Sequence, residues 1–170
     1  MTGEKSGTQP KRAPRAPTSR LKPSLAAVRF EVAGDEIRMG YHSRRLLRRL
    51  PPFDGKWGFL KREAYQLIRR QITEPGAHRT IKNIVRRWKR EPREPNYDDN
   101  PFYWGLLAID PAQDILDQQT LTRFAHQLMY AHRHDVPAHF LVGFLYQSGS
   151  TSEVSRKLAA DQREPWFGGR

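Results

Sequence analysis

The sequence of 170 residues contains no cysteine, which excludes a disulfide framework and a metal site built on thiolates. No apolar run comes near the roughly 18 residues of a membrane-spanning helix, so we expect none. The N-terminus lacks the apolar core of a signal peptide, and we therefore expect the protein in the cytoplasm. Hydrophobic residues make up only 37% of the chain, which indicates that part of it stays unfolded.

Two common catalytic motifs are also absent. Neither the phosphate-binding loop G-x-x-x-x-G-K-[ST] nor the nucleophile elbow G-x-S-x-G occurs. The hydroxyl-rich stretch "QSGSTSEV" at residues 147–154 instead predicts a loop and a helix start, with Ser150 and Glu153 as a capping box. We predict no catalytic residue and no cofactor.

Acidic residues are scarce in the first half of the chain. Residues 1–94 carry 24 Lys and Arg against 9 Asp and Glu, a net charge of +15, whereas residues 95–170 carry 6 against 9, a net charge of −3. The asymmetry indicates that one part of the protein contacts nucleic acid or another anionic surface. The sign changes at the proline-rich stretch "EPREPNYDDNP". We therefore predict a basic half at residues 24–94 and a near-neutral half at residues 95–170, joined in one compact unit.

Residues 1–23 contain no large apolar side chain except Met1 and Leu21. We predict a disordered basic tail, because nothing in it could offset the entropy lost on ordering. The tail either lies over phosphates or only keeps the protein soluble.

The segment "AAVRFEVAGDEIRMGY" alternates, with Val28, Phe30 and Val32 on one side of an extended chain. Ala-Gly-Asp-Glu then offers a turn. This pattern predicts a short β-hairpin over residues 28–39.

The rest of the chain shows helical spacing, and the predicted fold is mainly α, a helical bundle. A short helix is expected in "YHSRRLLRRL", before Pro51 and Pro52, with its four arginines on one face. The clearest helix covers residues 56–73, and another follows in "HRTIKNIVRRWKRE". Trp57 and Trp88 lie on the apolar stripes of these helices and are predicted to be buried. Further helices are expected from Thr120, Pro137 and Ser150.

Arg79, Lys82, Arg86 and Lys89 recur at spacings of three and four, which places them in one helical stripe roughly 15 Å long. Like charges at this spacing repel, and few acids in the stretch relieve them, so the stripe suggests an anionic partner. The predicted nucleic-acid-binding residues are Arg44, Arg45, Arg48, Arg49, Arg62, Arg69, Arg70, Arg79, Lys82, Arg86, Arg87, Lys89 and Arg90.

Two groups of residues could instead hold a metal ion. Asp110, Asp114 and Asp117 would align on a helix and could hold Mg²⁺, although they equally suit a helix start, where negative charge is favourable. The histidines at 126, 132, 134 and 139, together with Asp135, lack the i, i+4 pair of a helical zinc site. We favour a structural role for both groups and predict no metal site.

The stretch "REAYQLIRRQITEPGAHRTIKNIVRRWKR" and the helices expected over residues 120–160 resemble the α-helical small subunits of multi-subunit CRISPR effector complexes. The resemblance covers roughly residues 41–162 and is one of size, charge and helix pattern, without a diagnostic motif. It implies a subunit that guides nucleic-acid strands without cleaving them, and copies that stack side by side.

The sequence thus predicts a non-catalytic, sequence-independent nucleic-acid-binding subunit of a ribonucleoprotein complex. Its partners would be the backbone of RNA or DNA and other protein subunits, including copies of itself. Two alternatives stay open. One is a dimeric DNA-binding regulator of plasmid or phage type, and the other is a metal-dependent nuclease that uses the aspartates or histidines.

Overall fold

A computed structural model describes residues 23–88, 92–93 and 96–167. These residues form seven α-helices and a 3-10 turn, and none of them lies in a strand, which confirms the prediction of a mainly α protein. In chain order the elements are α1 (Leu25–Leu46), α2 (Lys56–Ile72), α3 (Ala77–Arg87), α4 (Pro101–Ile109), α5 (Gln118–Arg133), η1 (Ala138–Phe140), α6 (Leu141–Gln147) and α7 (Thr151–Ala159).

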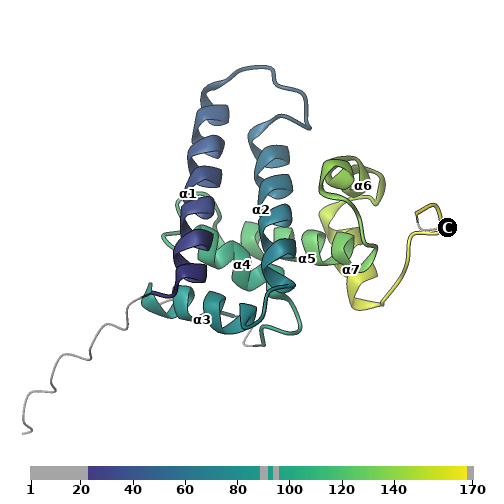
Figure 1. Ribbon diagram of the computed structural model, residues 1–170. Coiled ribbons are helices and arrows are strands. Elements are labelled where there is room, and N and C mark those ends of the chain that lie inside the picture. Colours follow the sequence, from purple (N-terminus) through teal and green to yellow (C-terminus); the bar gives the residue numbers. More distant parts are fainter. Residues whose placement is uncertain (1–22, 89–91, 94–95, 168–170) are drawn as a thin grey trace, which may run out of the picture.

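The two longest helices stand side by side and antiparallel (Figure 1). Helix α3 crosses their lower end, α4 and α5 pack behind them, and α6 and α7 lie beyond α5 (Figure 1). Helices from both halves of the sequence contribute to one hydrophobic core. Within the described ranges no helix is long and apolar enough to cross a membrane.

The predicted β-hairpin is wrong, because residues 28–39 lie inside α1. The buried residues of α1 are spaced three and four apart, which is the period of a helix. A helix buries Phe30 and leaves Val28 and Val32 exposed, whereas a strand would have placed all three on one face. Ser24 begins the helix by accepting a hydrogen bond from the backbone N–H of Ala27 at 3.2 Å. The residues that α1 buries are Ala27, Phe30, Gly34, Ile37 and Tyr41.

The predicted short helix before Pro51 is also changed, because α1 continues only to Leu46. Leu47 is extended, with ψ of 132°, and Arg49 takes a left-handed backbone with φ of 63°. Arg48 and Arg49 therefore belong to the connection to α2 and do not share a helical face with the two arginines before them. The prolines that follow favour this early end, since they cannot continue a helix.

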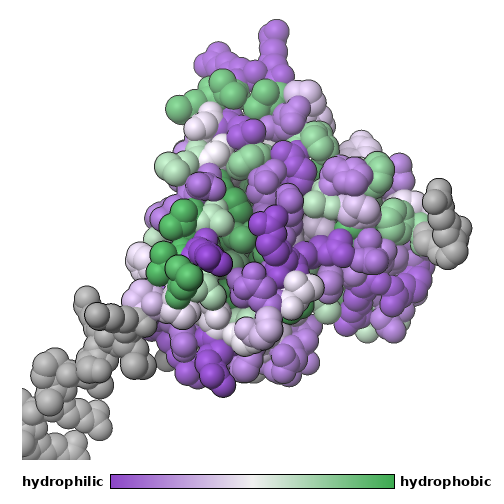
Figure 2. All heavy atoms as spheres, viewed as in Figure 1, coloured by the Kyte–Doolittle hydropathy of each residue, from purple (hydrophilic) through white to green (hydrophobic). Residues whose placement is uncertain are grey.

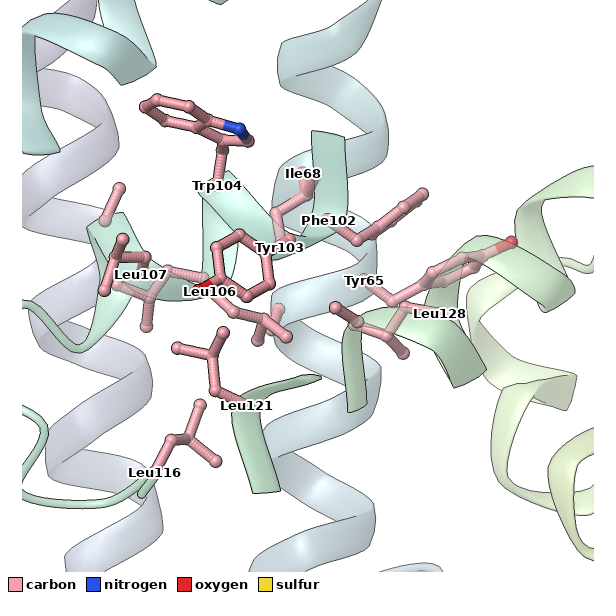
Figure 3. Packing of buried hydrophobic residues seen from close by; sticks show 14 of the residues in the cluster. Tyr65, Ile68, Phe102, Tyr103, Trp104, Leu106, Leu107, Leu116, Leu121 and Leu128 are labelled. Atoms are coloured by element: carbon pink, nitrogen blue, oxygen red, sulfur yellow. The ribbon is translucent and has the colours of Figure 1, made fainter. Parts of the chain in front are cut away.

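Helix α4 lies at the centre of the molecule, and every one of its nine residues is buried. Figure 3 shows its Phe102, Tyr103 and Leu106 surrounded by side chains of α2 and α5. The ring of Phe102 stacks on Tyr65 of α2, with the ring centres 5.5 Å apart. A helix that is apolar on all sides requires neighbours on all sides, and α1, α2, α3 and α5 supply them. The burial of α4 agrees with its composition, since none of its nine residues carries a charged side chain.

The approach of α4 to α2 depends on Gly105. A methyl group added there would lie 2.5 Å from Cγ1 of Ile68, which is closer than two carbon atoms can come without a shift. Gly40 plays the same part between the two long helices, because a methyl group there would lie 2.5 Å from the ring of Phe59.

We expect Gly105→Ala to lower the free energy of unfolding by about 1–3 kcal/mol, because the extra carbon overfills the contact between α2 and α4. Gly143→Ala in α6 is the matched control, since a methyl group added at this site would meet no neighbouring atom within 4 Å. The control should be neutral or more stable by up to about 1 kcal/mol, through higher helix propensity. Urea unfolding followed by circular dichroism measures both, and equal stability of the two variants would contradict the tight contact.

Candidate nucleic-acid interface

The structure divides the predicted binding residues into two main groups. The first lies at the α1–α2 tip, defined here as residues 44–62 at the upper end of the two long helices in Figure 1. The second lies on α3 at the opposite end. Arg87 of α3 pairs with Glu31 of α1, which precedes Arg45 by 14 residues, so the groups are about 20 Å apart along α1. The predicted Lys89 and Arg90 lie outside the described residues.

The α1–α2 tip carries seven Lys and Arg but a single acid, Asp54. Arg45, Arg48 and Arg49 are exposed, and no acid of the described residues forms an ion pair with them. Three guanidinium groups with open donors therefore stand close together in sequence at one end of the protein.

Two other arginines hold the α1–α2 tip together. The guanidinium carbon of Arg44 lies 3.7 Å from the centre of the Phe59 ring, and that of Arg62 lies 4.5 Å from the Phe53 ring. Arg62 also donates to the backbone carbonyl of Phe53 at 3.3 Å and to the carboxylate of Glu63 at 3.0 Å. Both arginines are partly buried by these contacts, so they support the tip more than they extend its charge.

Apolar side chains surround the open arginines. Leu46 is 83% exposed and Leu47 59%, and Phe53 and Trp57 are also partly open. Figure 2 shows hydrophobic and hydrophilic residues mixed at the upper end of the molecule. Trp57, predicted to be buried, lies instead at the edge of the core, against Tyr41 and Phe124.

Lys61 is a cation that burial makes less useful for binding phosphate. Its ammonium nitrogen lies 4.2 Å from the centre of the Phe124 ring, and burial lowers its pKa to about 8. Lys56, which is not among the predicted binding residues, lies at the start of α2 with its nitrogen 5.4 Å from the centre of the Trp57 ring. The sequence could have indicated Lys56, because this residue begins a helix directly after the connection that contains Pro51 and Pro52.

On α3, Arg79 and Arg86 are exposed and Lys82 is half-buried, with its nitrogen 5.6 Å from the centre of the Trp104 ring. Arg87 pairs with Glu31 of α1 at 2.7 Å. The repulsion along this helix is thus partly relieved by an acid from another helix, which the sequence spacing could not reveal. Trp88, predicted to be buried, is 50% exposed.

Arg69 is a structural tether. One of its nitrogens donates to the backbone carbonyl of Val136 at 2.7 Å, and another pairs with Asp135. The hydroxyl of Tyr65 donates to the same carbonyl at 2.8 Å, and burial raises the pKa of Tyr65 to about 12. These contacts join α2 to the turn after α5. The neighbouring Arg70 is exposed.

Two of the three aspartates, Asp110 and Asp117, accept hydrogen bonds from the backbone through their carboxylates. The buried carboxylate of Asp110 accepts hydrogen bonds from the backbone N–H groups of Asp114, Ile115 and Leu116 at 3.1, 3.0 and 2.7 Å. Asp117 begins α5, and the hydrogen bond from the backbone N–H of Thr120 lowers its pKa. The segment between Asp110 and Asp117 is not helical, so the three carboxylates are not aligned.

The histidines His132 and His134 also make separate structural contacts. His134 donates from Nδ1 to the carbonyl of Tyr130 at 2.8 Å and accepts at Nε2 from the N–H of Glu164 at 2.8 Å, which defines its neutral tautomer. His132 packs edge-on against Phe102, and burial, followed by the charge of Arg69, lowers its pKa. Among the residues that the structure describes, no group of three or more His, Asp or Glu is placed to hold a metal ion.

Comparison with known proteins identifies no relative. No protein-family model, no curated protein and no solved structure matches this chain. The resemblance to CRISPR small subunits therefore stays a prediction.

We expect Arg69→Met to lower the free energy of unfolding by about 1–3 kcal/mol, because the buried carbonyl of Val136 loses a charged donor. Arg70→Met removes the same charge from the next position and should change stability by less than about 0.5 kcal/mol. Thermal unfolding of both variants provides the comparison. Equal melting temperatures would show that Arg69 is not a tether.

We expect Asp110→Ala to cost about 3 kcal/mol or more, since three backbone donors lose their acceptor, whereas Asp114→Ala should be nearly neutral. Denaturant unfolding measures both. Cleavage distinguishes the alternative of a metal-dependent nuclease. If the protein were such an enzyme, Asp114→Ala would abolish Mg²⁺-dependent cleavage of labelled DNA or RNA while the variant stayed folded.

Proposed function

We propose that the protein binds the backbone of nucleic acid through the α1–α2 tip, without reading sequence and without catalysing a reaction. The observation that supports this most directly is the open trio of Arg45, Arg48 and Arg49, exposed and without acidic partners among the described residues. Phosphate groups are the ligands that such unpaired guanidinium groups favour.

The local shape favours phosphate contacts over base recognition. Arg48 and Arg49 project from an irregular connection, and a connection of this kind cannot lie in the major groove as a recognition helix does. The nearby rings of Phe53 and Trp57 are 40% and 37% exposed, which leaves room for stacking on unpaired bases. This combination of cations and aromatic rings suits a single strand better than a duplex.

The α3 group would provide a second, weaker contact. Arg79 and Arg86 are open, but Arg87 is paired and Lys82 is held over an indole ring. Because the groups are about 20 Å apart, a bound strand would have to run along the length of α1 to reach both. Such a protein would act in the cytoplasm as an accessory subunit of a ribonucleoprotein complex, as the resemblance to CRISPR small subunits implies.

The test compares two matched double variants, Arg48→Gln with Arg49→Gln at the tip and Arg79→Gln with Arg86→Gln on α3. Fluorescence anisotropy with labelled oligonucleotides of mixed sequence, single- and double-stranded, gives affinity at several salt concentrations. The tip variant should bind at least about ten-fold more weakly to every sequence. The slope of log K against log salt should become shallower by about 1.4–1.8, as expected for two lost phosphate contacts.

The α3 variant should lose less affinity than the tip variant. Circular dichroism controls for intact helices in both. Unchanged binding by a folded tip variant would exclude the tip as the binding surface. A footprint confined to one defined sequence would favour the DNA-binding regulator instead.

A further inference from the structure

Helix α1 carries a second apolar stripe, on the side that faces away from the core. Its members are seven residues apart, which keeps them nearly in line on a helix. They are widely open to solvent: Leu25 is 65% exposed, Val32 53%, Met39 62% and Leu46 83%. Val28, 39% exposed, extends the stripe sideways. Hydrophobic residues gather along the edge of the molecule that α1 forms (Figure 2).

This stripe is separate from the buried one. The core-facing residues of α1, such as Phe30 and Ile37, lie on the opposite side of the helix. Core packing against α2 and α4 therefore does not explain the exposed stripe. An exposed row of large apolar side chains on one helix face is typical of a surface that a partner covers.

The N-terminal tail of the chain is a poor partner for the stripe. Residues 1–22 contain two large apolar residues, Met1 and Leu21, against six Lys and Arg. A segment of this composition has too little apolar surface to cover four hydrophobic side chains. A second copy of α1, by contrast, presents the same heptad spacing and can pack against itself.

We propose that α1 pairs with α1 of a second copy, antiparallel and centred on Val32. In this register Val32 meets Val32 of the partner subunit on the two-fold axis, and Leu25 meets the partner subunit's Met39. Along one flank, Arg29 of each chain faces the partner subunit's Glu36, which forms two ion pairs of opposite charge across the interface.

Charge selects this register over the others. If the antiparallel helices were shifted to use Leu46 as well, Glu36 would face Glu36 of the partner subunit and Asp35 would face the partner subunit's Asp35. A parallel pair would set Asp35 against the partner subunit's Glu36. Both arrangements place like charges together, which costs stability, and the register centred on Val32 avoids this.

The pairing involves about four turns of each helix, from Leu25 to Met39, which is at the small end of specific interfaces. We therefore expect a dissociation constant on the order of micromolar. The α1–α2 tip, including Leu46, lies beyond the paired segment. Dimerisation thus leaves the proposed nucleic-acid surface open, and each can be tested without the other.

Sedimentation equilibrium of the full chain across the micromolar range, without nucleic acid, tests the dimer. The mass should rise with concentration from one chain to two. Val32→Glu, which places two carboxylates on the two-fold axis, should keep the protein monomeric. Leu47→Glu is the matched control, because it adds the same charge to an exposed apolar site outside the stripe. A protein that stays monomeric throughout, or a dimer that Val32→Glu leaves intact, overturns the proposal.

Charge exchange and crosslinking test the register. Arg29→Glu alone and Glu36→Arg alone should each weaken the dimer, and the double variant should restore it. Because the chain has no cysteine, Val32→Cys introduces a single thiol that should form an intermolecular disulfide on oxidation, whereas Leu25→Cys should not. Crosslinking of Leu25→Cys as fast as Val32→Cys, or a double variant weaker than both single variants, overturns the register.

Discussion

The complete burial of α4 is the constraint on which the rest of the structure depends. A nine-residue helix with no charged side chain must be enclosed, so α1, α2, α3 and α5 are arranged around it. Its ends contain polar backbone groups that cannot reach water and need partners within the protein. Asn100 accepts from the N–H of Tyr103 at the start, and the carboxylate of Asp110 organises the loop that follows. The close approach at Gly105 brings α2 near enough to exclude voids.

The same packing decides which cations are available for binding. Arg69, Arg62 and Arg87 have partners supplied by distant parts of the chain or by neighbouring rings. Arg45, Arg48 and Arg49 remain open because the α1–α2 tip projects beyond the core, where no acid of the described residues pairs with them. Sequence composition counts all of these residues equally as charges. The folded protein uses some of them to support its own connections and leaves others for a ligand.

The sequence of α1 fits two periodicities, the alternation of a strand and the spacing of a helix. Val28, Phe30 and Val32 alternate as in a strand, and Phe30 also belongs to a helical series that reaches Tyr41. The helix prevails because its buried side packs on α2 and α4, whereas an isolated hairpin would leave its backbone and its apolar face without partners. Two of the three residues that made the segment look like a strand, Val28 and Val32, are exposed on the outer face of α1. Their exposure leads to the proposed pairing between copies.

The sequence by itself determined the helical class, the buried aromatic run of α4, the capping box of Ser150 and Glu153, and the concentration of positive charge in the first half. These features depend on local spacing and composition, which a single chain records directly. Only the tertiary structure decided that residues 28–39 are helical, that Trp57 and Trp88 are partly open, and that the basic residues divide into two groups about 20 Å apart. Those outcomes depend on contacts between residues far apart in the chain, such as Glu31 with Arg87 and Arg69 with Val136. The spacing of residues along a short segment does not reveal such contacts or their free energies.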